Sequence, residues 1–408
     1  MNKIVYILIL FNILMFGCDT EKNLNPGSQD YFIKYYGEDG NQVGKDLYQV
    51  SDGYILLGTT KKGIDSYQGV LAKTDFQGNQ QWIVEFGGLS DDFPNSVIEA
   101  SDGNLIVSST LQYNTGESDI MLYRFSNAGG LIDSMIYVLP GSQMAGEVVN
   151  TVDGGYIVTG TSSALGDNNF ISLRTDQVLT VFPDSLWRKE LGFNDLVEDI
   201  GVGINIINDT TFVLFGSSNT IPQDGETGAL GGYNAMAIEI NNYGEPNSGR
   251  NLFGTLLNQN VSEVIKTSNG QFMIVGTTEL ATNQYDIFVQ LATSKYVDLP
   301  MVNVNLSTGN NIKGKAVAES NYGLYYVLGE VIINNRTNIY IAKVSPLGEV
   351  VAERILGTNP STSSFSDEAS KGIIGTPDGG VIFLSTFNLE NQTKMALVKM
   401  SSDLLLYK

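Results

Sequence analysis

The sequence predicts an all-β fold, a seven-bladed β-propeller in which each blade is a four-stranded sheet. A turn signal recurs seven times along the 408 residues, and an apolar run typical of a β-strand follows each signal. The composition agrees, because 45 glycines and only 16% charged residues suit short strands and tight turns better than long amphipathic helices. A repeat architecture also allows a chain of this length to form one closed unit.

The turn signal is an Asp or Asn followed closely by Gly or a second turn residue. Its spacing of roughly 50 to 60 residues is typical of four-stranded propeller blades. Asp, Asn and Gly tolerate the positive φ that a two-residue type I′ hairpin turn requires, so each signal is expected to join the first and second strands of a blade. The seven signals are Asp52-Gly53, Asp102-Gly103, Asp153-Gly154, Asn208-Asp209, Asn269-Gly270, Asn321 to Gly323 and Asp378-Gly379.

Second strands such as YILLGTT (54–60) are continuously apolar, as expected when neighbouring blades cover both faces. Third strands such as VLAKTD (70–75) are also apolar, whereas fourth strands such as WIVEFGG (82–88) and MIYVLPG (135–141) are more polar. Only six fourth strands lie downstream of the turns. YFIKYYG (31–37) matches WIVEFGG in pattern, so we expect the N-terminal segment to complete the last blade and close the ring.

The N-terminus has the pattern of an export signal. Lys3 precedes an apolar stretch from residue 4 to 16, and Gly17 and Cys18 follow it. Cys18 is the only cysteine, so the chain holds no disulfide partner for it. We expect a signal peptide over 1–17, a lipidated Cys18 with a polar tether over 18–30, and the propeller over 31–408; the alternative is a plain secretory signal with an incidental cysteine.

Two resemblances support this organisation. LMFGC (14–18) resembles the lipobox of bacterial lipoproteins, although Met15 and Phe16 depart from the usual residues. The repeat, with DGGYIVTG (153–160), K-T-D (73–75) and a G-x-x-x-W pattern (78–82), resembles propeller repeats of secreted and surface proteins of Bacteroidota and covers nearly all of the mature chain. The resemblances imply a lipid-anchored protein of the cell envelope, at the outer membrane, and they specify architecture rather than activity.

The charge and composition exclude several functions. A net charge of −21 repels a phosphate backbone, so nucleic acid is not an expected partner. The absence of histidine excludes Ser-His-Asp and Cys-His catalysis and removes the commonest ligand of transition metals. No cofactor is expected; structural calcium is the alternative, for which GEDGNQVGKD (37–46) only weakly approximates a binding loop.

The connections between second and third strands look long and varied, and they share one face of the ring with the connections between blades. We call this the long-loop face, and binding sites on repeat scaffolds usually lie in such loops. A rim of aromatic and acidic side chains there is the candidate site, against the alternative that loops are merely polar. The candidate residues are Tyr67, Phe93, Tyr113, Asp224, Tyr233, Tyr285 and Phe365.

The expected function is therefore non-catalytic: an envelope lipoprotein that binds a protein or glycan on its long-loop face, as an accessory subunit of an outer-membrane assembly. The alternative is a glycosidase-like enzyme that uses acidic residues on the same face, because such chemistry needs carboxylates and no histidine. A purely scaffolding role for the blade sides is the third option.

Three triplets resemble the Asp-Ser/Thr-hydrophobic acceptor for O-glycosylation in Bacteroidota. Short strings of this kind also arise by chance, and modification requires surface placement. The candidate acceptors are Ser134, Ser185 and Thr210.

Overall fold

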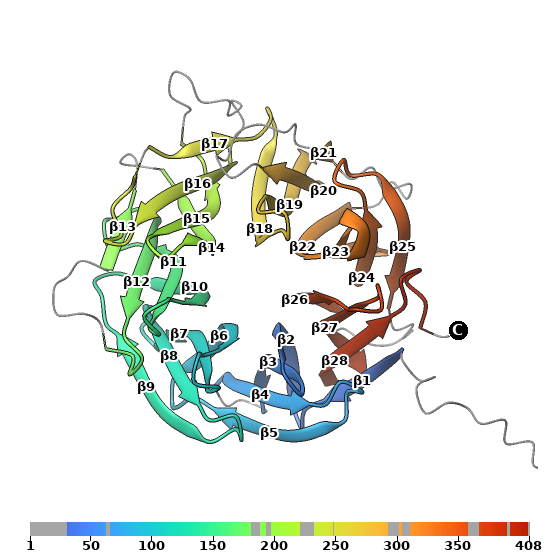
Figure 1. Ribbon diagram of the computed structural model, residues 1–408, viewed down its shortest axis with the longest axis horizontal. Helices are drawn as coiled ribbons and strands as arrows, with labels where there is room; N and C mark the ends of the chain where they lie inside the picture. The colour runs from blue at the N-terminus through green and yellow to red at the C-terminus, as the bar shows by residue number, and fades with distance from the viewer. Residues whose placement is uncertain are drawn as a thin grey trace, which may run out of the picture.

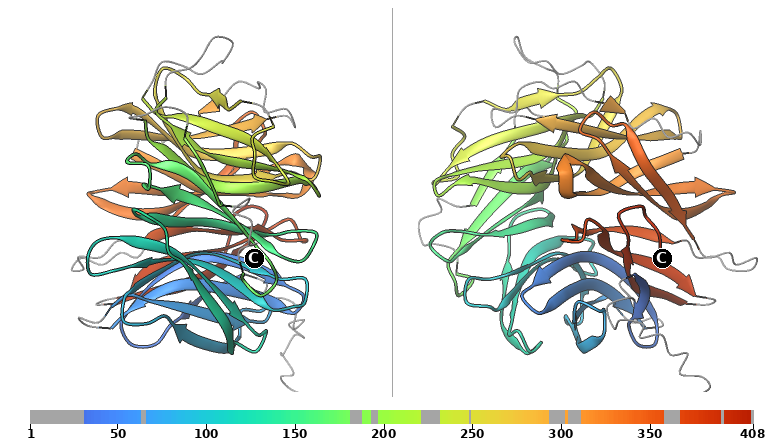
Figure 2. Two further views of the ribbon diagram at one scale, coloured as in Figure 1. Left: turned by 90° about the vertical axis from the view of Figure 1, so that its left-hand side faces the viewer. Right: turned by 45° about the vertical axis from the view of Figure 1, so that its right-hand side comes forward.

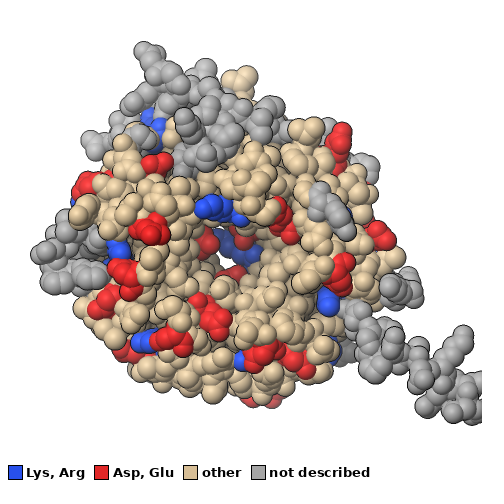
Figure 3. All heavy atoms as spheres, in the orientation of Figure 1, with Lys and Arg blue, Asp and Glu red and all other residues tan. Residues whose placement is uncertain are grey.

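The computed structural model describes residues 31–62, 66–180, 188–192, 197–220, 232–247, 249–292, 302–303, 311–357, 367–389 and 392–406. These residues form seven four-stranded antiparallel sheets arranged as a ring (Figure 1). The side views show strands running across the thickness of the ring (Figure 2), and a central channel opens on its face (Figure 3). The protein is a seven-bladed β-propeller, as the sequence predicts.

Each blade uses four strands in chain order from the channel outward, except the last. Blades 1 to 3 comprise β2 (Asn41–Val50), β3 (Gly53–Lys61), β4 (Gln68–Thr74) and β5 (Gln80–Phe86); β6 (Asp91–Glu99), β7 (Leu105–Gln112), β8 (Ser118–Phe125) and β9 (Leu131–Tyr137); and β10 (Gln143–Asn150), β11 (Tyr156–Ser162), β12 (Asn169–Thr175) and β13 (Arg188–Leu191).

Blades 4 and 5 comprise β14 (Asp199–Asn208), β15 (Thr211–Ser218), β16 (Asn234–Asn241) and β17 (Asn251–Phe253); and β18 (Asn258–Lys266), β19 (Phe272–Ala281), β20 (Gln284–Ala292) and β21 (Val302–Asn303). Blades 6 and 7 comprise β22 (Asn311–Glu319), β23 (Tyr325–Ile333), β24 (Arg336–Val344) and β25 (Val350–Leu356); and β26 (Glu368–Gly375), β27 (Val381–Leu389), β28 (Gln392–Met400) and β1 (Phe32–Tyr36).

The hydrophobic core lies between blades rather than within them. Leu57 of blade 1, for example, shares one buried cluster with Val107 and Phe125 of blade 2. Second and third strands are buried on both faces by such clusters, which explains their continuous apolar sequence.

A glycine recurs in the second strand because the strand approaches a neighbouring carbonyl too closely for a side chain. A Cβ at Gly160 would lie 2.1 Å from the carbonyl oxygen of Met144, and one at Gly216 would lie 1.9 Å from that of Ile200. Real Cβ atoms do not tolerate such distances. The repeated glycine of the motif is therefore a steric requirement of the pairing between first and second strands.

The N-terminal strand closes the ring, as predicted. β1 pairs antiparallel with β28, from Phe32 opposite Lys399 to Tyr36 opposite Met395. The buried Tyr36 hydroxyl donates a hydrogen bond of 2.6 Å to the carbonyl of Gly78 in blade 1, which ties blade 7 to its neighbour.

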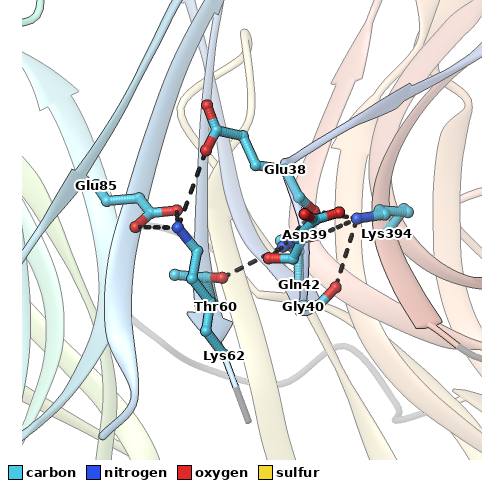
Figure 4. Close-up of polar contacts among 8 residues, drawn as sticks. All are labelled: Glu38, Asp39, Gly40, Gln42, Thr60, Lys62, Glu85 and Lys394. Atoms are coloured by element: carbon cyan, nitrogen blue, oxygen red, sulfur yellow. Dashed lines mark hydrogen bonds and ion pairs between the residues drawn. The ribbon is translucent and has the colours of Figure 1, made fainter. Parts of the chain in front are cut away.

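A second set of contacts holds this junction on the long-loop face (Figure 4). The Lys394 ammonium donates to the carbonyl oxygens of Glu38 and Gly40 and, at 2.9 Å, to Oε1 of Gln42. The Gln42 amide in turn donates to the carbonyl of Glu38 at 3.0 Å and to Thr60 Oγ1 at 3.2 Å. One chain end is thus fastened to the other by side-chain and backbone bonds.

The opposite face is held by cations near the ends of the third strands. Lys73 pairs with Asp52 of its own turn at 2.9 Å and donates to Asn127 Oδ1 of the next blade at 2.5 Å. Arg174 repeats this with Asp153 at 2.7 Å and with the next blade's turn at Asn242. The periodic Lys and Arg residues therefore hold adjacent blades together.

The predictions about connections are partly wrong. Most first-to-second connections span five residues: the amide of Gly103 donates to the carbonyl of Ala100, and Gly103 has φ +79°. The type I′ signature, positive φ at two consecutive residues, occurs instead at Asn334 and Asn335 on the long-loop face. The strand bounds leave two-residue second-to-third turns in blades 5 and 6, and connections longer than five residues on that face occur in blades 1, 3 and 4.

The outer strand of blade 2 is also misplaced in the sequence prediction. β9 spans Leu131–Tyr137 rather than 135–141, because it begins directly after the turn at Gly129 and ends before Leu139. The predicted signal peptide, Cys18 and the tether lie outside the described residues. Among the residues that are described, no helix is long and apolar enough to cross a membrane.

Candidate functional site

The first strand of every blade carries a β-bulge where it lines the channel. The register shifts at equivalent points, for example between Gly44 and Asp46 in blade 1 and between Val261 and Glu263 in blade 5. A bulge inserts an extra residue and re-aims the side chains around it. Asp46 lies directly after the extra residue of the bulge in blade 1. The equivalent residues in blades 2 to 7 are, in order, Ser96, Glu147, Gly203, Glu263, Ala316 and Gly372.

The three carboxylates at this position cap the backbone of the following blade. Asp46 accepts a hydrogen bond of 2.8 Å from the amide of Val97, and Glu147 accepts one of 2.9 Å from the amide of Ile204. Glu263 does the same for Val317 at 2.5 Å. These amides belong to the innermost strands, which have no neighbouring strand on the channel side, and the carboxylates supply hydrogen-bond acceptors for them.

Small residues alternate with the carboxylates for a steric reason. The receiving blades carry Ser96, Gly203 and Ala316 at the same position. A Cβ at Gly203 would lie 2.8 Å from Oε2 of Glu147, so the reaching carboxylate occupies the space of a side chain there. Carboxylate and small residue thus form matched pairs across three blade junctions.

The channel carboxylates have raised pKa values. Burial raises the pKa of Asp46 to about 6 and that of Glu147 to about 7, while backbone hydrogen bonds and Lys371 partly offset the effect. Burial also raises the pKa of Glu263 well above its ordinary value, and Glu147 and Asp46 raise it further. Charged side chains of both signs are visible in the channel (Figure 3). Carboxylic acids that hold protons near neutral pH are candidates for general acid chemistry.

The space beside these carboxylates is small. A cavity of about 50 Å³ lies among Asp46, Glu147, Glu263 and Lys371. Ligand pockets usually measure roughly 300 to 1,000 Å³, whereas one buried water needs only about 10 to 15 Å³. The cavity therefore suits a few water molecules. In the part of the chain that the structure describes, no three acidic residues are arranged to hold a metal ion.

Two of the aromatic candidates on the long-loop face, Tyr67 and Phe93, lie in contact. Tyr67 packs against Phe93 of the next blade with ring centroids 5.1 Å apart and ring planes inclined at 40°, and the Lys61 ammonium lies 4.1 Å from the Tyr67 ring centre. All three side chains are half-buried. They form a platform of two rings and one cation, which we call the Tyr67 platform. Phe93 belongs to β6 rather than to the loop before it.

Tyr233 and Tyr285 occupy the same repeat position as Tyr67 in blades 4 and 5. The amide of Tyr67 donates to Asp91 Oδ1 at 2.7 Å, and the amides of Tyr233 and Tyr285 donate to Asn258 and Asn311 at 3.1 and 3.0 Å. Tyr285 also repeats the cation contact, since the Lys313 ammonium lies 4.5 Å from its ring centre. These rings are therefore placed by the repeat, in separate blades.

The remaining candidates are less suited to binding or lie beyond the description. The Tyr113 hydroxyl donates to Asp119 at 2.8 Å within its own blade. Asp92, which precedes the candidate Phe93 in β6, is fully buried and accepts bonds from Ser109 and Tyr123, so its carboxylate is structural. Asp224 and Phe365 lie outside the described residues.

Of the proposed O-glycosylation residues, Ser134 lies in the outer strand β9 and Thr210 lies in the turn between β14 and β15. Ser185 lies outside the described residues.

The channel carboxylates were missed by sequence reasoning. Glu147 and Glu263 follow Gly146 and Ser262 in predicted first strands, and an acidic residue within such a partly buried strand is the signal that could have indicated them.

The sequence matches no family model, and no curated protein matches it. Solved structures do share the fold. A Ulvanlyase, described as a new family of polysaccharide lyase bound to -[GlcA(1-4)Rha3S]-, matches with a TM-score of 0.59 at 11% identity, covering 90% of this chain and 95% of that one. A second polysaccharide lyase matches with a TM-score of 0.54 at 8% identity, covering 94% of both chains.

A puromycin hydrolase matches with a TM-score of 0.54 at 10% identity, covering 88% of this chain and 52% of the other. At such low identity these likenesses establish the propeller architecture alone.

Proposed function

We propose that the protein is a lipid-anchored envelope propeller that binds a polysaccharide on its long-loop face. The observation that carries this proposal is the Tyr67 platform, in which Tyr67 and Phe93 from adjacent blades stack beside Lys61. Two half-buried rings inclined at 40°, with an ammonium group over one of them, offer the apolar area and the orienting charge that ligand sites combine. The similar cation contact at Tyr285 supplies a second contact of the same chemistry on the same face.

Binding fits the described residues better than catalysis for two reasons. The carboxylates with raised pKa values border a cavity of about 50 Å³, which is too small for a sugar ring. Each of them is also engaged in capping the next blade, so a catalytic role would compete with a structural one.

A carbohydrate-active enzyme is the second candidate, and one observation favours it. Glu147 has a pKa of about 7, the range that suits a general acid at neutral pH. The solved structures support this candidate more than a purely non-catalytic role, since two with the same fold are polysaccharide lyases. In this candidate the channel carboxylates, rather than the long-loop carboxylates expected from the sequence, carry the chemistry.

A polysaccharide array separates the two candidates. We expect the purified protein to retain at least one polysaccharide without releasing fragments, and Tyr67→Ala and Phe93→Ala to weaken binding about tenfold, or about 1.4 kcal/mol. Tyr243→Ala is the matched control, because Tyr243 is an exposed tyrosine in a turn on the opposite face. Binding that survives both platform substitutions contradicts the proposed site. Release of sugar fragments that Glu147→Gln abolishes would instead establish the enzymatic candidate.

The anchor is tested separately in the native host. Metabolic labelling with an alkyne fatty acid should label the protein, and Cys18→Ala should abolish both the label and membrane association. Labelling that persists in Cys18→Ala would refute this part of the proposal.

A further inference from the structure

The outer strand of blade 2 exposes apolar side chains on both of its faces. Leu131, Ile132, Met135 and Ile136 of β9 are 54%, 51%, 37% and 39% exposed, and Val138 directly after the strand is 71% exposed. Single exposed apolar residues are ordinary, but contiguous ones mark interaction surfaces in soluble proteins. This strand is therefore a candidate interface.

The edge of β9 is open within the described part of the chain, where β9 pairs with β8 alone. The backbone amide of Ser134 donates a hydrogen bond of 2.7 Å to the side chain of the preceding residue, Asp133, which indicates that this amide points away from β8. Natural proteins usually protect open edges with charged side chains, particularly lysine. Both β9 and β5 have a single charged residue, Asp133 and Glu85, whereas β25 has Glu353 and Arg354. What distinguishes β9 is its number of exposed large apolar side chains, which is four, against two in β25 and none in β5.

An apolar groove runs beside the exposed strand. It has a volume of about 540 Å³ and lies between β9 and the outer strand of blade 1. Tyr123 and Phe125 of β8 are buried at this groove, while Leu89 on its far side is 99% exposed. Side chains on one face of an added strand would fill this groove beside Ile136, and those on the other face would cover Met135.

We propose that β9 is a docking strand for an extended, basic and apolar segment of a partner polypeptide, which adds to blade 2 as a fifth strand. Strand addition supplies partners for the open backbone groups and places alternate side chains on both apolar faces. A basic segment is favoured because Asp133 is the only charged residue of β9, the groove lining includes no lysine or arginine, and the chain carries a net charge of −21. This surface is separate from the long-loop face.

A blocked nine-residue peptide tests the proposal. The probe alternates isoleucine and threonine between two terminal lysines, and its binding is measured by fluorescence anisotropy. We expect saturable binding to the full chain and at least tenfold weaker binding to Ser134→Pro, which removes the outward amide that the incoming strand needs. Proline is tolerated at solvent-facing amides of edge strands, so the fold should persist.

Ile136→Lys tests the same surface without altering the backbone, and it should also weaken binding at least tenfold. Val351→Lys is the matched control, because Val351 is 59% exposed on the outer strand β25 and should leave binding unchanged. Three results would each overturn the proposal: equal binding by wild type and both β9 variants, equally tight binding of a peptide with terminal glutamates, or dimerisation of the free chain through β9, which would make a second copy the occupant.

Discussion

Replacing Glu147 with glutamine should stabilise the protein at neutral and alkaline pH. The Glu147 carboxylate accepts a hydrogen bond of 2.9 Å from the amide of Ile204, and the amide oxygen of glutamine can accept the same bond. The substitution therefore keeps the hydrogen bond to blade 4 and replaces the ionisable carboxyl group with a neutral amide. Any change in stability then reports the cost of ionising this side chain inside the channel.

The magnitude follows from the pKa of Glu147, which is about 7 in the folded protein and 4.5 ordinarily. Each unit corresponds to about 1.4 kcal/mol, so ionisation of the folded protein costs about 3 kcal/mol. The folded state binds more protons than the unfolded state between these two values, and wild-type stability therefore falls as the pH rises from 4.5 to 7. Below pH 4.5 both states are protonated and the difference from Glu147→Gln vanishes.

Guanidinium unfolding of both proteins at pH 4.5 and pH 8 measures this difference. We expect Glu147→Gln to exceed wild type by up to about 3 kcal/mol at pH 8 and to match it at pH 4.5. Glu117→Gln, at an exposed loop carboxylate, is the control and should show no such dependence on pH. A variant that is less stable than wild type at pH 8, or a difference that is equal at both pH values, would refute the assignment of a buried, destabilising charge.

Three further changes test the ring. Deletion of 31–37 removes the strand paired with β28 and should lower the melting temperature by about 10 °C or more, and unchanged melting would refute closure by β1. Gly160→Ala places a Cβ 2.1 Å from the Met144 carbonyl and should cost more than about 2 kcal/mol in guanidinium unfolding, whereas a neutral effect would show that the pairing relaxes freely. Lys394→Met removes the ammonium that donates to the carbonyl of Glu38 and should lower the free energy of unfolding by about 1 to 3 kcal/mol. Lys266→Met is the control, because the exposed Lys266 ammonium donates to two carbonyls in another blade, and an equal loss of stability in both variants would show that the closure contacts are not special.

The sequence predicts the ring well because its signals are local and repeated. Second strands are recognisable from runs such as YIVTGTS, and the closing strand from the match between YFIKYYG and WIVEFGG. Connections are harder, because Asp-Gly and Asn-Asn suit several turn types that differ only in length and in which residue takes positive φ. The five-residue turn at Gly103 and the two-residue turn at Asn334 and Asn335 are consequently exchanged relative to the prediction.

The channel could not be predicted from alternation. A regular strand points consecutive residues to opposite faces, so Ser262 and Glu263 would not be expected to border the same space, yet both line the channel cavity. The bulge between Val261 and Glu263 breaks that rule, and nothing in a single repeat marks it. The Tyr67 platform, in contrast, combines residues 26 positions apart that the repeat itself places on neighbouring blades, so that part of the candidate face was accessible from the sequence.

The capping carboxylates join the blades in pairs, and seven blades cannot all be paired. They couple blade 1 to blade 2, blade 3 to blade 4 and blade 5 to blade 6, and an alternating order of this kind can close only on an even number. Seven blades leave one unpaired blade, in which Gly372 takes the place of a carboxylate and a Cβ would lie 2.4 Å from the Leu47 amide nitrogen. That blade is also the one completed by the N-terminal strand, and it contributes Lys371 to the channel. With seven blades, the junctions on both sides of blade 7 lack a carboxylate at this position, and Lys371 of that blade lines the same cavity as the three carboxylates.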